Sequence, residues 1–224
     1  MNNNDNILEL LDTDNVKTEF FMEEEVVVST IEVKRAMKNY FKHIQVRSSA
    51  ATLLLTKFGL TEAAALNQKT IDDQLNKFVQ DMSQDVQHTK SIIDDAGIKN
   101  VVTVNGLLKG KIKITSPTGF QFLNLLKLWD ELNINLTTLY MRQEIGQQEV
   151  TKSTTQWSKR IKKFNNTIES LSVTAYKATE QLKQQSRDKA EQRRLAKTKP
   201  VKSVSDKKIK EPSKLKTTPQ LKSA

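Results

Sequence analysis

The feature that most restricts the fold is a regular apolar pattern in the second half of the chain. Between residues 157 and 182, apolar side chains recur after alternating steps of four and three residues. They are Trp157, Ile161, Phe164, Ile168, Leu171, Ala175, Ala178 and Leu182. This spacing puts them on one stripe of a long α-helix. The stripe can be buried by folding back on the preceding helix or by a second copy of the chain. We predict a helical hairpin, with which a homodimer can coexist.

The helix expected before this stripe is the most apolar segment of the chain. Ser116 and Pro117 indicate its start, because serine caps helices and proline fits their first turn. Between Phe120 and Tyr140 the apolar residues leave only a narrow polar strip, which is typical of a helix packed on several sides. Gly146 permits the turn into the next helix. We therefore expect the core of the protein along this helix.

Two further helices are predicted upstream. Residues 61–96 carry an apolar line from Ile71 to Ile93 at roughly heptad steps, and Gly97 is placed to end that helix. Residues 49–58 form a shorter helical segment that ends at Gly59. The sequence thus predicts several helices joined by short connections.

A strand and an amphipathic helix are expected before residue 49. The β-branched run Val26–Val28 favours a short strand. Ser29 with Glu32 fits a capping box, so a helix should begin near Thr30. In that helix the apolar residues between 33 and 44 recur at helical spacing, and basic residues line a different face.

The other strand signals follow the 61–96 helix. Val101–Val104 and Lys111–Thr115 are separated by Gly106 and Gly110 and predict a small β-hairpin. With 6 glycines and 4 prolines, the chain lacks turn residues for many strands. The predicted fold class is mainly α: a helical bundle with a long helical hairpin, one or two short strands or a small β-hairpin, and a disordered basic C-terminal tail.

The net charge of +10 belongs to one end of the chain. Residues 181–224 hold 14 lysines and arginines against 4 acids, so the charges of residues 1–180 sum to zero. From about Lys197 onward the apolar residues are too few to offset the entropy of ordering, which predicts disorder. We divide the chain into an acidic leader (1–22), a helical domain (23–185) and a basic helix extension with a disordered tail (186–224).

Composition and motifs point away from an enzyme. The chain has no cysteine, and its two histidines, His43 and His88, lack ligand or catalytic partners at suitable spacing. Four aspartates of the 61–96 helix lie off its apolar line, and we interpret them as a solvated acidic face rather than paired catalytic carboxylates. They are Asp72, Asp73, Asp81 and Asp85. We expect a non-enzymatic protein without metal, cofactor or small-molecule substrate.

The expected location is the cytoplasm. Residues 1–14 carry acids and no base, which is the wrong sign for an export signal. No uncharged apolar run approaches the roughly 18 residues that a membrane span requires. The sequence therefore predicts a soluble cytoplasmic protein without a transmembrane segment.

Three basic clusters are candidate nucleic-acid-binding sites. They are Arg35, Lys38, Lys42 and Arg47; Lys159, Arg160, Lys162 and Lys163; and Arg187, Lys189, Arg193, Arg194 and Lys197. Basic side chains spaced along a helix can bind phosphates, and a basic tail gains counterion-release entropy. For the first two clusters a solvated helix face is an equally good interpretation. The tail could instead serve solubility or bind an anionic membrane surface.

Two segments resemble the AcaB-like family of transcriptional regulators of conjugative plasmids and integrative conjugative elements. Val26–Phe41 has the shape of the strand, threonine and basic helix that open these proteins. Ser116–Phe120, followed by leucines and Asp130, is similar to the family segment that leads into a leucine-rich helix with an aspartate. The resemblance implies a regulator of transfer genes that binds promoter DNA as a dimer. It assigns no DNA-contact residue to a position here.

Two functional hypotheses follow. The first is a dimeric DNA-binding regulator of conjugative-element transfer genes. The second is a helical structural or adaptor protein whose polybasic tail binds nucleic acid or an anionic surface without specificity. Steep salt dependence with a preferred promoter would favour the first. Equal weak binding to any duplex, lost on deletion of residues 198–224, would favour the second.

Overall fold

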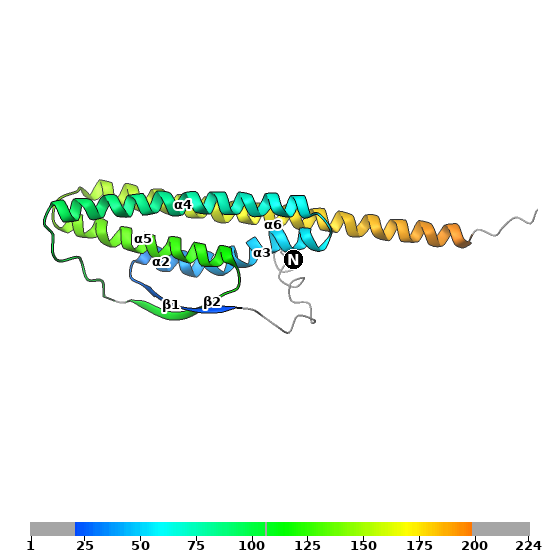
Figure 1. The fold of residues 1–224 in the computed structure, drawn as a ribbon, viewed down its shortest axis with the longest axis horizontal. Helices are drawn as coiled ribbons and strands as arrows, with labels where there is room; N and C mark the ends of the chain where they lie inside the picture. Colours follow the sequence, from blue (N-terminus) through cyan, green and yellow to red (C-terminus); the bar gives the residue numbers. More distant parts are fainter. Residues whose placement is uncertain (1–20, 106, 199–224) are drawn as a thin grey trace, which may run out of the picture. The chain divides into compact units, whose positions relative to one another are not determined.

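Long helices build most of the structure (Figure 1). The computed structural model describes residues 21–105 and 107–198. In chain order its elements are β1 (Met22–Val28), α2 (Ile31–Ala36), the π-helical turn η1 (Met37–Phe41), α3 (Lys42–Lys57), α4 (Thr61–Asp95), β2 (Leu108–Ile114), α5 (Pro117–Met141) and α6 (Gln147–Thr198). The mainly α fold class is confirmed. Most of the acidic leader and the predicted disordered tail lie outside the described residues.

The heptad stripe of α6 is buried within the same chain. Trp157 is 1% exposed and Phe164 is 0% exposed, and both belong to one core cluster with residues of α4 and α5. The ring centroid of Phe164 lies 6.0 Å from that of Phe78 in α4 and 6.1 Å from that of Phe122 in α5. The predicted helical hairpin is confirmed. Of the two ways to bury the stripe, the structure shows folding back.

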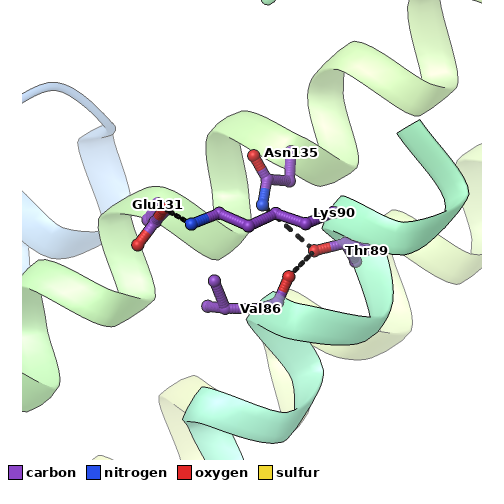
Figure 2. Close-up of polar contacts among 5 residues, drawn as sticks. All are labelled: Val86, Thr89, Lys90, Glu131 and Asn135. Atoms are coloured by element: carbon purple, nitrogen blue, oxygen red, sulfur yellow. Dashed lines mark hydrogen bonds and ion pairs between the residues drawn. The ribbon is translucent and has the colours of Figure 1, made fainter. Parts of the chain in front are cut away.

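The contact between α4 and α5 also contains polar pairs (Figure 2). Lys90 Nζ on α4 lies 2.6 Å from Glu131 Oε1 on α5. The buried Asn135 amide on α5 donates to Thr89 Oγ1 on α4 at 3.1 Å. A buried amide that lacks a partner is costly, so this bond favours one register of α5 along α4.

Several helix ends lie where the sequence places them. Ser116 caps α5, since its hydroxyl accepts a hydrogen bond from the Gly119 amide at 3.0 Å, and Pro117 occupies the first turn. Gly59 and Gly97 follow α3 and α4 with φ angles of +77° and +64°. These left-handed conformations favour glycine, so the predicted ends of both helices are confirmed.

The helix that follows β1 is longer than expected. Elements α2, η1 and α3 join without a gap over residues 31–57, so the predicted boundary at Ser49 is wrong. The predicted start is right, because Thr30 occupies the N-cap position of α2. No side chain of its own segment caps this helix, and the expected capping box of Ser29 with Glu32 does not form.

A carboxylate from α5 replaces that capping box. Asp130 is 7% exposed and accepts three hydrogen bonds: from the Ser29 amide at 2.8 Å, the Thr30 amide at 2.7 Å and the Thr30 hydroxyl at 2.6 Å. Asn133 donates to the Thr30 hydroxyl, and Thr154 of α6 donates to Asn133, each at 3.4 Å. A negative group at a helix N-terminus also complements the helix dipole. This network fixes the start of α2 against α5 and α6.

The two strands form an antiparallel sheet that lies beside α2 and α5 (Figure 1). Val26 and Val28 of β1 and Ile114 of β2 belong to the same buried cluster as the long helices. The strand expected at Val26–Val28 is therefore confirmed. Alternate residues of both strands face outward, as the two-residue period of a strand requires.

The predicted β-hairpin is wrong, although one of its strands exists. Val101–Val104 form no strand, and β2, which contains most of the expected Lys111–Thr115 strand, pairs with β1 instead. The Val102 amide donates to the Thr138 hydroxyl of α5 at 3.1 Å, so this loop uses a side-chain partner. Local β-branching does not reveal that a strand more than 70 residues upstream supplies the pairing.

Gln45 attaches α3 to the end of β2. Its Oε1 accepts a hydrogen bond from the Thr115 amide at 3.0 Å, and its Nε2 donates to the Lys113 carbonyl at 3.3 Å. Gly119 of α5 packs so closely on this side chain that a Cβ there would overlap Gln45 Oε1. The helix formed by residues 31–57 is thereby held to both the sheet and α5.

The chain divides into two compact units, residues 1–184 and residues 185–224. Element α6 contributes to both. Within the described ranges, every helix is too short or too polar to cross a membrane.

Candidate nucleic-acid interface

The first basic cluster lies on the helix formed by residues 31–57. Arg35 of α2, Lys38 of η1 and Lys42 of α3 are exposed. Arg47 is 3% exposed and interacts within the chain, so its proposed phosphate contact is wrong in this fold. Helical periodicity turns residue 47 toward the interior. We name the exposed side chains of Arg35, Lys38, Asn39 and Lys42 the helix-31 face.

The charge pattern alone does not reveal Asn39. It is exposed and lies four residues after Arg35 and three before Lys42, which is the spacing of neighbours on one helix face. That spacing is visible in the sequence, but a survey of charges overlooks an uncharged amide. Residues 31–57 contain a single acid, Glu32, so the face has a net positive charge.

The second cluster divides between structure and surface. Arg160 lies 2.7 Å from Asp81 of α4, and its guanidinium stacks 4.5 Å from the ring centroid of Trp157. The indole of Trp157 donates to Asp85 at 2.9 Å. Arg160 is thus part of the contact between α4 and α6, and its phosphate contact stays a prediction. Asp81 and Asp85 also correct the interpretation of the four aspartates as a purely solvated face.

The other members of that cluster remain exposed. Lys159, Lys162 and Lys163 all have exposed side chains. His43 Nδ1 lies 2.9 Å from Asn165 Oδ1, which joins the start of α3 to α6. Lys162 precedes Asn165 by one helical turn, and Lys42 precedes His43 directly. The helix that carries the helix-31 face and the helix that carries these lysines are therefore in contact through this pair.

The third cluster lies on the last turns of α6. Residues 185–195 are all exposed, including Arg187, Lys189, Arg193 and Arg194. Lys197 belongs to the same helix, but its side chain lies outside the description. A helix exposed on every side can present these cations to a polyanion along its whole length. We name this segment the α6 extension.

The sheet carries three more exposed lysines, Lys109, Lys111 and Lys113. The strand register places Glu25 opposite Lys111 and Glu23 opposite Lys113. Lys111 Nζ also lies 4.0 Å from Glu23 Oε2. Cross-strand acids thus offset most of this positive charge, and we leave the sheet out of the candidate interface.

The two histidines lie on different helices, His43 on α3 and His88 on α4. His43 is engaged by Asn165, and His88 lies on an exposed side of α4. Within residues 21–105 and 107–198, no group of three or more histidines, aspartates or glutamates is placed to hold a metal ion. The helix-31 face presents three cations and one amide, and groups of these kinds can bind phosphates and base edges.

The fold defines a class, namely a helical bundle with a two-stranded antiparallel sheet beside it. Among solved structures, the chain is similar to the crystal structure of selenomethionine-containing AcaB from uropathogenic E. coli. The TM-score is 0.68 at 18% sequence identity, over 84% of this chain and 94% of that chain. The AcaB-like fold expected from two short segments is confirmed. No protein-family model and no curated protein sequence matches the chain.

Proposed function

We propose that this protein is a non-enzymatic, DNA-binding transcriptional regulator of conjugative-element transfer genes and that it acts as a homodimer. The observation that carries the proposal is the helix-31 face, where Arg35, Lys38 and Lys42 are exposed on a helix fixed by buried contacts. The resemblance to the AcaB-like family supports the regulatory role. The fold likeness to AcaB is consistent with it.

The two basic surfaces have different parts in this proposal. The helix-31 face belongs to a helix held by Asp130 and Gln45, so it can dock in one orientation. The α6 extension presents exposed cations along a helix and adds affinity for any duplex. Specificity therefore comes from the first surface, and the second raises binding without regard to sequence.

The homodimer requires a surface other than the heptad stripe. Phe164 and its stripe neighbours pack against α4 and α5 of the same chain. The stripe is therefore already covered within one chain and is not available to a second copy. Sedimentation of the full chain with and without a promoter duplex tests the dimer. A single chain per duplex at saturation would contradict it.

A mobility-shift series tests the DNA-binding role. The triple variant Arg35→Gln, Lys38→Gln and Lys42→Gln should lose affinity for a transfer-gene promoter, and its log–log salt slope should fall by about 0.9 per lost phosphate contact. The matched control replaces three exposed lysines on α3 and α4 with glutamine. They are Lys57, Lys69 and Lys77.

The same series separates the proposal from the adaptor hypothesis. Deletion of residues 198–224 should weaken binding to all duplexes equally and leave the preference for the promoter in place. Loss of all binding on that deletion, with no effect of the triple variant, would instead favour an adaptor with a non-specific polybasic tail. The excess of bases in residues 181–224 is the observation behind that second candidate.

A further inference from the structure

Asn39 stands in the middle of the helix-31 face. Arg35 lies four residues before it and Lys42 three after it, and Lys38 is its direct neighbour. Its side chain is exposed, and none of the described residues forms a hydrogen bond or ion pair with it. Arginine and lysine can only donate hydrogen bonds, whereas a carboxamide both donates and accepts. Asn39 is therefore the residue of this face that can match a donor and an acceptor together.

The π-helical turn gives the face its geometry. Residues 37–41 form this turn, whose i→i+5 bonds enclose more residues than the 3.6 of an α-helical turn. Side chains four residues apart are therefore nearly aligned, so Asn39 lies close to the line of Arg35 and Lys42 close to that of Lys38. Phe41 remains in the core on the other side. Turns of this kind inside α-helices recur at functional sites.

We propose that Asn39 reads an adenine in the DNA major groove while Arg35, Lys38 and Lys42 hold the flanking phosphates. The inference rests on the proposed function of sequence-specific DNA binding. The asparagine amide can accept from the adenine N6 amino group and donate to N7 in one bidentate contact. The neighbouring cations position the helix but carry no sequence information.

The dimensions of the face suit a groove. Arg35 and Lys42 are seven residues apart, which is about 10 Å along a helix at roughly 1.5 Å per residue. The major groove is about 12 Å wide and admits one helix. At roughly 3.4 Å per base step, the face covers about three base pairs. We therefore expect the helix-31 face to read a short base sequence, with Asn39 near the centre of the contact.

Binding-site selection from random duplexes tests the inference on the full-length chain. We compare wild type, Asn39→Ala and the control Asn76→Ala, which changes an exposed asparagine on α4. Alanine favours helix, so both variants should keep the fold, as thermal unfolding by circular dichroism will show. Wild type and Asn76→Ala should enrich one motif with a fixed adenine, and Asn39→Ala should lose the preference at that position.

The affinities give a second readout. Asn39→Ala should bind the wild-type motif roughly 5- to 150-fold more weakly, which is the range for one bidentate base contact. Its salt slope should stay unchanged, because an amide neutralises no phosphate. If Asn39→Ala selects the same base at every position, the inference is overturned and the proposed function stands. If wild type enriches no motif, both are overturned.

Discussion

Two regions of the molecule differ in the kind of contact that holds each of them in place. Helices α4, α5 and α6 meet through stacked and edge-on aromatic rings such as Phe78, Phe122 and Phe164. The helix formed by residues 31–57 also buries apolar side chains, but hydrogen bonds to Asp130 and between Gln45 and the end of the sheet define its position. Apolar burial is strong and non-directional, whereas hydrogen bonds add little net energy and fix geometry. The proposed interface is carried by the region with directional contacts.

The largest effect should come from the aromatic region. Phe164→Ala removes a ring that is 0% exposed and leaves a cavity between α4, α5 and α6. We expect the free energy of unfolding to fall by about 3 to 5 kcal/mol, measured by urea denaturation. Phe120→Ala is the control, because Phe120 is 39% exposed on α5 and should cost far less. Equal losses for the two variants would contradict the packing described for α6.

A smaller loss is expected where Asp130 caps α2. Asp130→Ala leaves the amides of Ser29 and Thr30 without their acceptor, and we expect a loss of about 2 to 3 kcal/mol. The rate of hydrogen exchange should rise most at those two amides and less along α5. Glu131→Ala removes an adjacent carboxylate with a largely exposed partner, Lys90, and should cost at most about 1 kcal/mol. A loss for Asp130→Ala no larger than for Glu131→Ala would argue against the cap.

Much of the helical fold is predictable from the sequence, because the apolar period of a long helix shows which of its faces is buried. The stripe from Trp157 to Leu182 and the cap at Ser116 gave the helical hairpin and the start of α5. The pairing of β1 with β2 was not predictable, since it joins strands from opposite ends of a long stretch of chain. The Asp130 cap is likewise non-local, and local rules favoured Ser29 with Glu32 instead.

The candidate interface shows the same limit residue by residue. Charge spacing found Arg35, Lys38 and Lys42, which are exposed, but it could not separate them from Arg47, which is buried. Nor could it show that Asp81 of α4 neutralises Arg160. Each outcome depends on which face of a helix meets another element, and that is a tertiary property. An uncharged residue between cations, Asn39, gave no charge signal at all.

A contrast of about 1 kcal/mol should separate Arg160 from Lys162. Arg160→Gln removes an ion pair with Asp81 and the contact with Trp157, so we expect it to lower stability by about 1 kcal/mol without changing DNA affinity. Lys162→Gln, on an exposed side of the same helix, should leave stability unchanged and weaken DNA binding modestly. Thermal unfolding and mobility shifts on both variants provide the measurement. The reverse pattern would return Arg160 to the interface and remove Lys162 from it.

The smallest expected effect concerns the contact between α3 and α6. A double-mutant cycle on His43→Ala and Asn165→Ala should give a coupling energy of about 0.5 to 1 kcal/mol, the usual size for one hydrogen bond. Each single variant should raise hydrogen exchange in the first turns of α3 and leave α4 and α5 protected, because the aromatic contacts remain. The pair therefore contributes little to overall stability, although it joins the helix that carries Lys42 to the helix that carries Lys162. Zero coupling would mean that apolar packing alone positions this end of the helix-31 face.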